Sequence, residues 1–98
     1  MAAPIYVGDE VSAAGFRLAG ARVSVPGPGD EEAALARARA DAPLVLLSAA
    51  VAARIRESVV LAALAATDPL LMIVPDLQGI APMPDLVARL RGQLGLET

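Results

Sequence analysis

The sequence predicts an α/β fold: a small, doubly wound sheet of four parallel strands flanked by helices, with receiver-like topology. Two observations lead to this prediction. Short apolar runs alternate with segments of helical pattern, and nearly every residue within most of those runs is apolar. Such runs are typical of strands in parallel sheets that helices cover on both faces. Because crossovers between parallel strands are right-handed, the simplest doubly wound strand order is 2-1-3-4.

The strands are predicted from their apolar residues and from the turn residues that bound them. Gly8 closes the first run, the second run alternates apolar and polar residues, and Pro43 precedes the third. A loop rich in proline and glycine, residues 26–30, follows the second run. The four predicted strands are residues 4–8, 21–25, 44–47 and 70–74.

The helices between these strands are predicted from their caps and charges. Asp9 and Glu10 stand in the first turn of the first helix, where acidic side chains complement the helix dipole. Asp30 is a suitable N-cap for the second helix. The third is expected as one continuous helix from Ser48 or Ala49 to about Thr67.

The chain is expected to divide near residue 75. A length of 98 residues suits one domain and leaves no room for two. Residues 1–75 are expected to form the α/β domain, and residues 76–98 a tether followed by an amphipathic C-terminal helix. Apolar residues in that helix follow the spacing i, i+3, i+4, i+7, at Met83, Leu86, Val87, Leu90 and Leu94.

The composition argues against several classes of function. The net charge is −3, all eight basic residues are arginine, and the chain has neither histidine nor cysteine. Without cysteine there are no disulfides or thiolate metal sites, and without histidine the commonest general base and metal ligand is missing. No basic run supports binding to nucleic acid. We therefore expect no cofactor, no metal site and no nucleic-acid partner.

The sequence also predicts a cytoplasmic chain that does not insert into a membrane. Residues 1–10 lack the basic region and the long apolar stretch of a signal peptide. The longest apolar run, residues 58–66, is far shorter than the roughly 20 residues that a membrane-spanning helix needs.

A ligand site is a hypothesis for the carboxyl ends of the strands, where ligands of doubly wound sheets bind. Asp9, Glu10 and Ser48 are expected there, and two acids could hold Mg²⁺ as in a phospho-receiver domain. A receiver also needs an aspartate where Ser48 stands and a lysine further on, and this chain has no lysine. Glycine motifs of nucleotide sites are missing too. No catalytic residue is predicted, and a stand-alone receiver-like signalling or small-ligand-binding domain remains the alternative.

The helix faces point instead to a surface for another protein. One side of the first helix is expected to face the sheet, while Phe16 and Gly20 point elsewhere with Arg17 beside them; Phe16 could also tuck under a neighbouring helix. The third helix is apolar on two sides, so it is expected between the sheet and a second surface, either the terminal helix or another protein. The sheet sides are expected to carry Val11, Ala14, Gly15 and Leu18 in the first helix, and Val51, Ile55, Val59, Ala62 and Ala66 in the third.

The stretch VGDEVSAAGFRLAGARV, residues 7–23, closely resembles the opening of the F subunit of V-type and archaeal A-type rotary ATPases. That family begins with a strand ending in Gly-Asp, followed by a short helix carrying Gly-Phe-Arg-Leu-Ala-Gly, here residues 15–20. This hexapeptide is the specific part of the resemblance. The later elements follow in the same order over essentially the whole chain, with the segments PLVLLS, ARIRE, LLMIVP and LVARLRGQLGLE.

The resemblance implies a non-catalytic component of the central rotor stalk, peripheral to the membrane, with a mobile C-terminal helix. The domain would bind the coiled-coil D subunit of the stalk, and the terminal helix would reach toward the catalytic A and B subunits. ATP hydrolysis or synthesis would take place in those partners, and proton or sodium transport in the membrane rotor. The residues expected at partner interfaces are Phe16, Arg17, Gly20, Val60, Leu61, Leu64, Leu86, Leu90 and Leu94.

Overall fold

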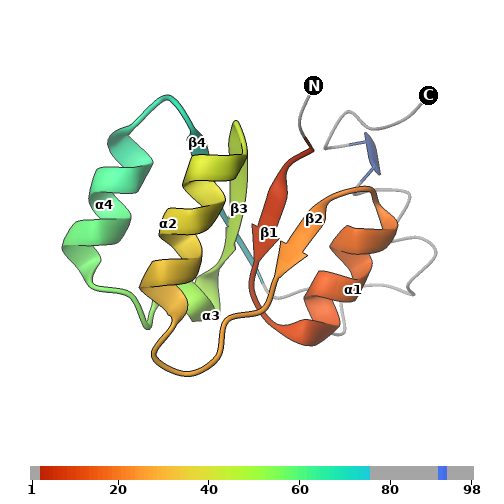
Figure 1. Cartoon of the computed structure of the whole chain (residues 1–98), viewed down its shortest axis with the longest axis horizontal. Coiled ribbons are helices and arrows are strands. Elements are labelled where there is room, and N and C mark those ends of the chain that lie inside the picture. Colours follow the sequence, from red (N-terminus) through yellow and green to blue (C-terminus); the bar gives the residue numbers. More distant parts are fainter. Residues whose placement is uncertain (1–2, 76–90, 93–98) are drawn as a thin grey trace.

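A parallel four-stranded sheet lies between two layers of helices, with α1 on one face and α2, α3 and α4 on the other (Figure 1). The computed structural model describes residues 3–75 and 91–92. The strand order β2-β1-β3-β4 confirms the prediction. The elements are β1 (Ile5–Val7), α1 (Glu10–Leu18), β2 (Arg22–Ser24), α2 (Glu31–Asp41), β3 (Leu44–Ser48), α3 (Ala49–Ala52), α4 (Glu57–Ala65) and β4 (Leu70–Val74).

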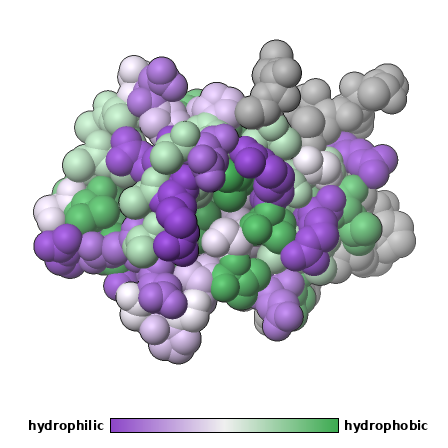
Figure 2. All heavy atoms as spheres, in the orientation of Figure 1, coloured by the Kyte–Doolittle hydropathy of each residue, from purple (hydrophilic) through white to green (hydrophobic). Residues whose placement is uncertain are grey.

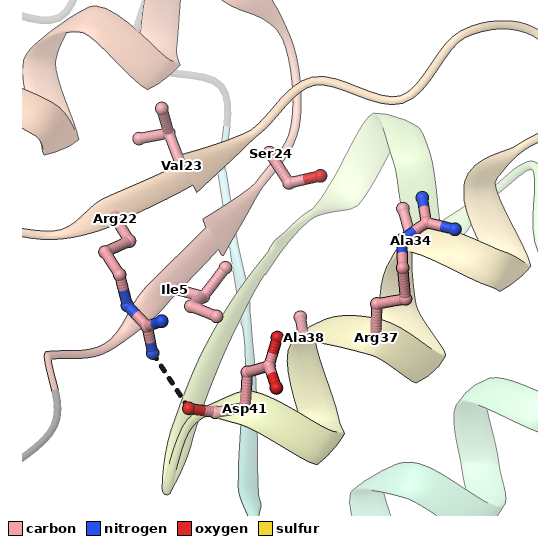
Figure 3. A pocket seen from close by; sticks show the side chains of 8 residues that line it. All are labelled: Ile5, Arg22, Val23, Ser24, Ala34, Arg37, Ala38 and Asp41. Carbon is pink, nitrogen blue, oxygen red and sulfur yellow. Dashed lines mark hydrogen bonds between the residues drawn. The ribbon is translucent and has the colours of Figure 1, made fainter.

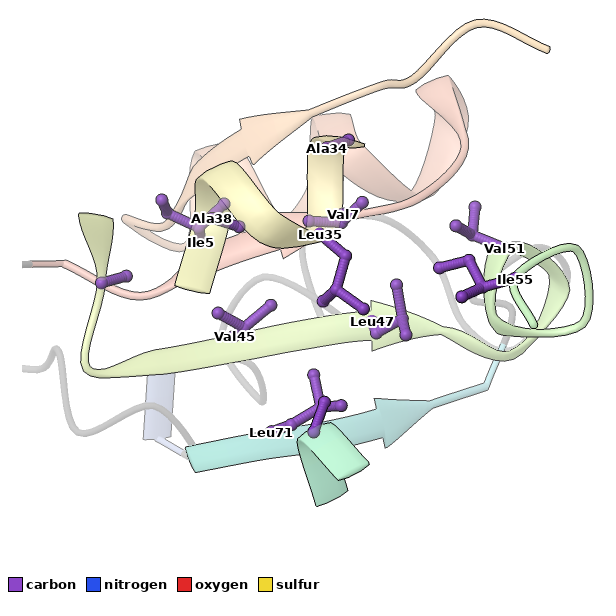
Figure 4. Packing of buried hydrophobic residues seen from close by; sticks show 12 residues of the cluster. Ile5, Val7, Ala34, Leu35, Ala38, Val45, Leu47, Val51, Ile55 and Leu71 are labelled. Atoms are coloured by element: carbon purple, nitrogen blue, oxygen red, sulfur yellow. The ribbon is translucent and has the colours of Figure 1, made fainter. Parts of the chain in front are cut away.

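The core consists of two clusters, one on each face of the sheet. The larger one lies under α2, α3 and α4, and Figure 4 shows its aliphatic side chains meeting between α2 and the strands β1 and β3. Successive strand residues point to opposite faces, so Val45 and Leu47 belong to this cluster and Leu46 to the other. The smaller cluster, under α1, contains Tyr6, Ala13, Phe16, Ala19, Ala21 and Leu46.

The third predicted helix is in fact two helices, α3 and α4, so the prediction of one continuous helix was wrong. Ile55 lies between them and is buried in the larger cluster. Carboxylates from the first turn of α2 hold this junction. The guanidinium of Arg56 contacts Glu32 at 2.9 Å, and that of Arg54 lies 3.7 Å from Glu31. The Arg56 hydrogen bonds keep the pKa of Glu32 below its ordinary value. These long-range contacts and the burial of Ile55 accompany the break between α3 and α4.

The orientation of α1 is also a correction. Val11 and Leu18, expected against the sheet, are each 54% exposed, while Phe16 is only 2% exposed. The Phe16 ring stacks on Tyr6 of β1, with the ring centroids 4.3 Å apart. Burial of the largest apolar ring on the helix outweighs burial of the smaller Val11 and Leu18 side chains. Gly15 was expected on the sheet side and is buried. Ser12 and Ala13 were expected to point away from the sheet, and they are buried as well.

The C-terminal end of α1 explains Gly20. Its φ of 106° lies in the left-handed region that favours glycine. The N–H of Gly20 donates to the carbonyl of Arg17, and the N–H of Ala21 donates to that of Phe16. This is the Schellman arrangement that ends many helices. Gly20, expected at a partner interface, thus has a role in the fold of the domain itself.

Candidate functional site

The carboxyl ends of β1 and β3 form the place where a ligand of a doubly wound sheet would bind, because the strand order reverses between them. The candidate side chains here cap helices. The Asp9 carboxylate accepts a hydrogen bond of 2.9 Å from the N–H of Ser12 at the start of α1. The Ser48 hydroxyl accepts one of 3.0 Å from the N–H of Val51 at the start of α3. Glu10 is exposed in the first turn of α1.

The Tyr6 side chain occupies the space beside these caps. It is fully buried, and its hydroxyl lies 3.4 Å from the Asp9 carboxylate. Gly8 follows at the end of β1, where a Cβ would overlap the Tyr6 hydroxyl. Glycine is therefore required at position 8 to make room for the tyrosine. Among residues 3–75 and 91–92, no group of three acidic, histidine or cysteine side chains could hold a metal ion.

The buried position of Tyr6 shifts the ionisation of this cluster. Burial raises the pKa of the Tyr6 hydroxyl to about 12. Burial also opposes ionisation of Asp9, but hydrogen bonds from the backbone and side chain of Ser12, and from Tyr6, outweigh it and hold the pKa of Asp9 below its ordinary value. A protonated phenol next to a capping carboxylate is a structural arrangement, and it supplies no general base near neutral pH.

The raised pKa of Tyr6 predicts that the domain loses stability at alkaline pH. The chain has one tyrosine, no cysteine and no lysine, so Tyr6 is its side chain that titrates between pH 10 and 12. The folded-state pKa of about 12 lies above the unfolded value of 10.0, so the unfolded state releases its proton first. The free energy of unfolding should be constant from pH 8 to pH 10 and then fall by about 1.4 kcal/mol per pH unit up to pH 12.

Urea unfolding from pH 8 to 12 measures this slope, and tyrosinate absorbance of the folded protein measures the pKa directly. Tyr6→Phe is the matched control and should lose the slope while keeping the ring stack. A tyrosinate signal that appears at pH 10 in the folded protein would show that Tyr6 is not buried as described.

A hollow of about 240 Å³ lies between β2 and α2 (Figure 3). The Arg22 guanidinium points toward the end of α2 and donates to the Asp41 carbonyl at 2.8 Å. It also donates to the Ala3 carbonyl at 3.3 Å. Arg37 and the Asp41 carboxylate add opposite charges to the lining. Because Arg22 is occupied by backbone carbonyls and the charges are mixed, the hollow does not concentrate one sign of charge for an ionic ligand.

The residues expected at partner interfaces are distributed unevenly in the structure. Leu61 and Leu64 on α4 are exposed, at 55% and 41%. Val60 is half-buried and packs against the larger core cluster. Arg17 is exposed. Phe16 is buried in the smaller cluster, so its ring is not available to a partner in this structure; Leu86, Leu90 and Leu94 lie outside the described residues.

Exposed apolar side chains on β4 are a feature that the sequence pattern did not predict. The run LLMIV was expected to be buried, yet Leu70, Met72 and Ile73 are 49%, 48% and 38% exposed. The predicted strand order already places β4 at an edge of the sheet. This edge position was the feature of the sequence analysis from which the exposure of β4 could have been predicted. We call Leu61, Leu64 and Ile73 the α4 surface, because Ile73 points to the same side of the sheet as Leu71, which packs in the cluster under α4.

The α4 surface contains three of the large apolar side chains that are exposed among the described residues. Figure 2 shows strongly apolar atoms at the molecular surface over the region of α4. From Glu57 to Val74, the sequence has only two charged residues, Glu57 and Asp68. No helix in the described part of the chain is long and apolar enough to cross a membrane. A largely uncharged apolar face on a short helix is suited to contact with another protein.

Comparison with known protein families identifies the family of this chain. A family model described as ATP synthase (F/14-kDa) subunit matches residues 5–90. No curated protein and no solved structure was matched. The matched range covers every helix and strand described above, and it includes the hexapeptide of residues 15–20. The chain therefore belongs to the ATP synthase (F/14-kDa) subunit family, that of the F subunit of V-type and A-type ATPases.

Proposed function

We propose that this chain is the non-catalytic central-stalk component of a V/A-type ATPase or ATP synthase that translocates protons or sodium ions. Its domain binds the coiled-coil D subunit and couples or regulates rotation. Its C-terminal helix reaches the A and B subunits, and the whole complex holds the chain at the cytoplasmic side of the membrane. The observation that carries this proposal is the α4 surface on a member of the F-subunit family.

The chemistry of the α4 surface fits a coiled-coil partner. Leu61 and Leu64 stand three residues apart on α4, so their side chains form a short ridge on one side of the helix. Such a ridge can pack into the grooves between the side chains of another helix. Since a coiled coil presents long rows of side chains, it can receive this ridge without rearrangement of the domain.

The side chains at the carboxyl ends of the strands support a non-catalytic role. Asp9 and Ser48, which a receiver-like mechanism would use, are engaged as helix caps, and Tyr6 fills the space beside them. A phosphorylated or Mg²⁺-bound state would require Asp9 to give up its cap. We therefore assign nucleotide chemistry to other components of the complex and assembly to this one.

Co-expression with the D subunit encoded in the same genome tests the proposal. The two chains should co-purify as a 1:1 complex, and the complex should persist at high salt because the α4 surface is apolar and salt screens only the charged contacts. The D subunit of an unrelated rotary ATPase is a suitable specificity control. Failure of the two chains to co-purify at any salt concentration would reject the proposal.

A further inference from the structure

The outer edge of β2 presents backbone groups that pair with no other strand in the described part of the chain. The backbone groups of Arg22 and Ser24 bond at 2.9 and 3.1 Å to the residues that flank β1. Because successive strand residues direct their N–H and C=O groups to opposite edges, those of Val23 and Val25 point away from the sheet. Val25 precedes Pro26, a position that favours extended backbone.

The side chains along this edge leave room on both faces of the sheet. Val23 packs on the smaller core cluster, so Val25, two residues later, lies on the same face, and it is 47% exposed. Ser24 lies on the other face, where it borders the hollow between β2 and α2 (Figure 3). A further strand beside β2 could therefore cover Val25 on one face without meeting α2 on the other.

The charges near this edge do not prevent two copies of it from approaching. Residues 21–29 contain one charged residue, Arg22. Its guanidinium donates to the carbonyls of Asp41 and Ala3 in its own chain. Edge strands are commonly protected from pairing by lysine, by proline or by a charge that points inward. Residues 23–25 have none of these, so this edge is open to a strand of matching hydrogen-bond pattern.

The hydrogen-bond pattern of this edge is complementary to itself. A two-fold axis that passes through the sheet at Ser24 would place two β2 strands antiparallel, with Val23 of each copy opposite Val25 of the other. Each such pair can exchange both of its N–H···O=C bonds, and cross-strand pairs of β-branched side chains are favourable. An axis at Val23 would instead place Val25 opposite Ala21, whose N–H already donates to the Phe16 carbonyl. The pattern therefore favours the register centred on Ser24.

We propose that two copies of the free chain pair through the outer edges of β2, antiparallel and centred on Ser24, to form one continuous sheet. Because β2 is short, the interface is small, and small interfaces are weak. We expect a dissociation constant of roughly 100 μM or above. The α4 surface lies by β4, at the opposite edge of the sheet, and stays open in this dimer. The inference concerns the chain alone and does not rest on the proposed function.

Single introduced cysteines test the register, because the chain has none of its own. Ser24→Cys puts the cysteine on the axis, where opposite Cα atoms are about 4.5 Å apart and a disulfide can form. Val25→Cys is the matched control: it is more exposed, but its two Cα atoms would be roughly 8 Å apart, beyond disulfide reach. Under mild oxidation of the full chain, we expect Ser24→Cys to form disulfide dimers at least about tenfold faster. Equal rates, or a faster Val25→Cys, would overturn the proposal.

Sedimentation over a concentration series tests the pairing without a cross-link. The parent chain should self-associate as its concentration approaches roughly 1 mM. Val25→Pro removes an outward N–H from each copy and should stay monomeric, whereas Val25→Thr keeps this N–H and the branched Cβ and should associate like the parent. Urea midpoints establish that each variant is folded. A parent chain that stays monomeric, or a Val25→Pro variant that associates equally, would reject the proposal. Because no partner protein is present, that result leaves the co-expression test with the D subunit unaffected.

Discussion

Phe16→Ala is expected to destabilise the domain by about 3–5 kcal/mol, the usual cost of removing a buried aromatic side chain. The ring is 2% exposed and stacks on Tyr6 at 4.3 Å, so its loss removes apolar burial and leaves a cavity between α1 and β1. A domain of this size is stable by roughly 5–15 kcal/mol in total. Urea denaturation of the isolated chain measures the change.

Leu18→Ala is the control for Phe16→Ala on the same helix. Leu18 is 54% exposed, and substitutions at exposed positions usually change stability by no more than about 0.5 kcal/mol. The comparison also separates the two hypotheses for Phe16 that its sequence position leaves open. A stable Phe16→Ala protein that fails to bind the D subunit would place the ring at the interface and contradict its burial.

Leu61→Arg is expected to weaken binding to the D subunit by at least about thirtyfold, the loss that corresponds to about 2 kcal/mol at an interface hot spot. The substitution leaves an arginine charge unpaired against an apolar partner surface. It should not harm the fold, because arginine favours helix and Glu57 stands four residues earlier on α4. Calorimetric titration of the partner into each variant gives the affinities.

Val25→Arg is the matched control for Leu61→Arg. Val25 is 47% exposed and follows β2, at the opposite edge of the sheet from β4. The variant carries the same added charge in place of an exposed apolar residue, so it should bind the D subunit like the parent chain. Similar losses in both variants would indicate an effect of net charge and would remove the α4 surface from the interface.

Much of the fold follows from local sequence. The apolar runs, the prolines and the acidic helix starts predicted all four strands, their order and the starts of α1 and α2. The break between α3 and α4 did not follow, because the contacts at it, the burial of Ile55 and the ion pairs with Glu31 and Glu32 of α2, involve residues far away in the sequence. The side of α1 that faces the sheet was predicted wrongly for a similar reason. The apolar periodicity predicted that the side with Val11 and Leu18 faces the sheet. In the structure the side with Phe16 faces it, because Phe16 stacks on Tyr6.

The candidate site was predicted only in part. Leu61 and Leu64 were identified from the second apolar stripe of the third helix, and both are exposed. The exposure of β4 was missed because a run of five apolar residues suggests burial on both sides, although an edge strand has a neighbour on only one side. The capping roles of Asp9 and Ser48 could not be predicted from the sequence, because only their positions in the structure distinguish a helix cap from a ligand site.

Hydrogen exchange of the chain, alone and with the D subunit, tests most directly whether the partner binds the α4 surface. If it does, added protection should appear at the backbone amides of α4 and β4. The amides at the carboxyl ends of β1 and β3, near Asp9 and Ser48, should exchange equally in both samples. Protection that appears at those ends and leaves α4 unchanged would contradict the proposed interface.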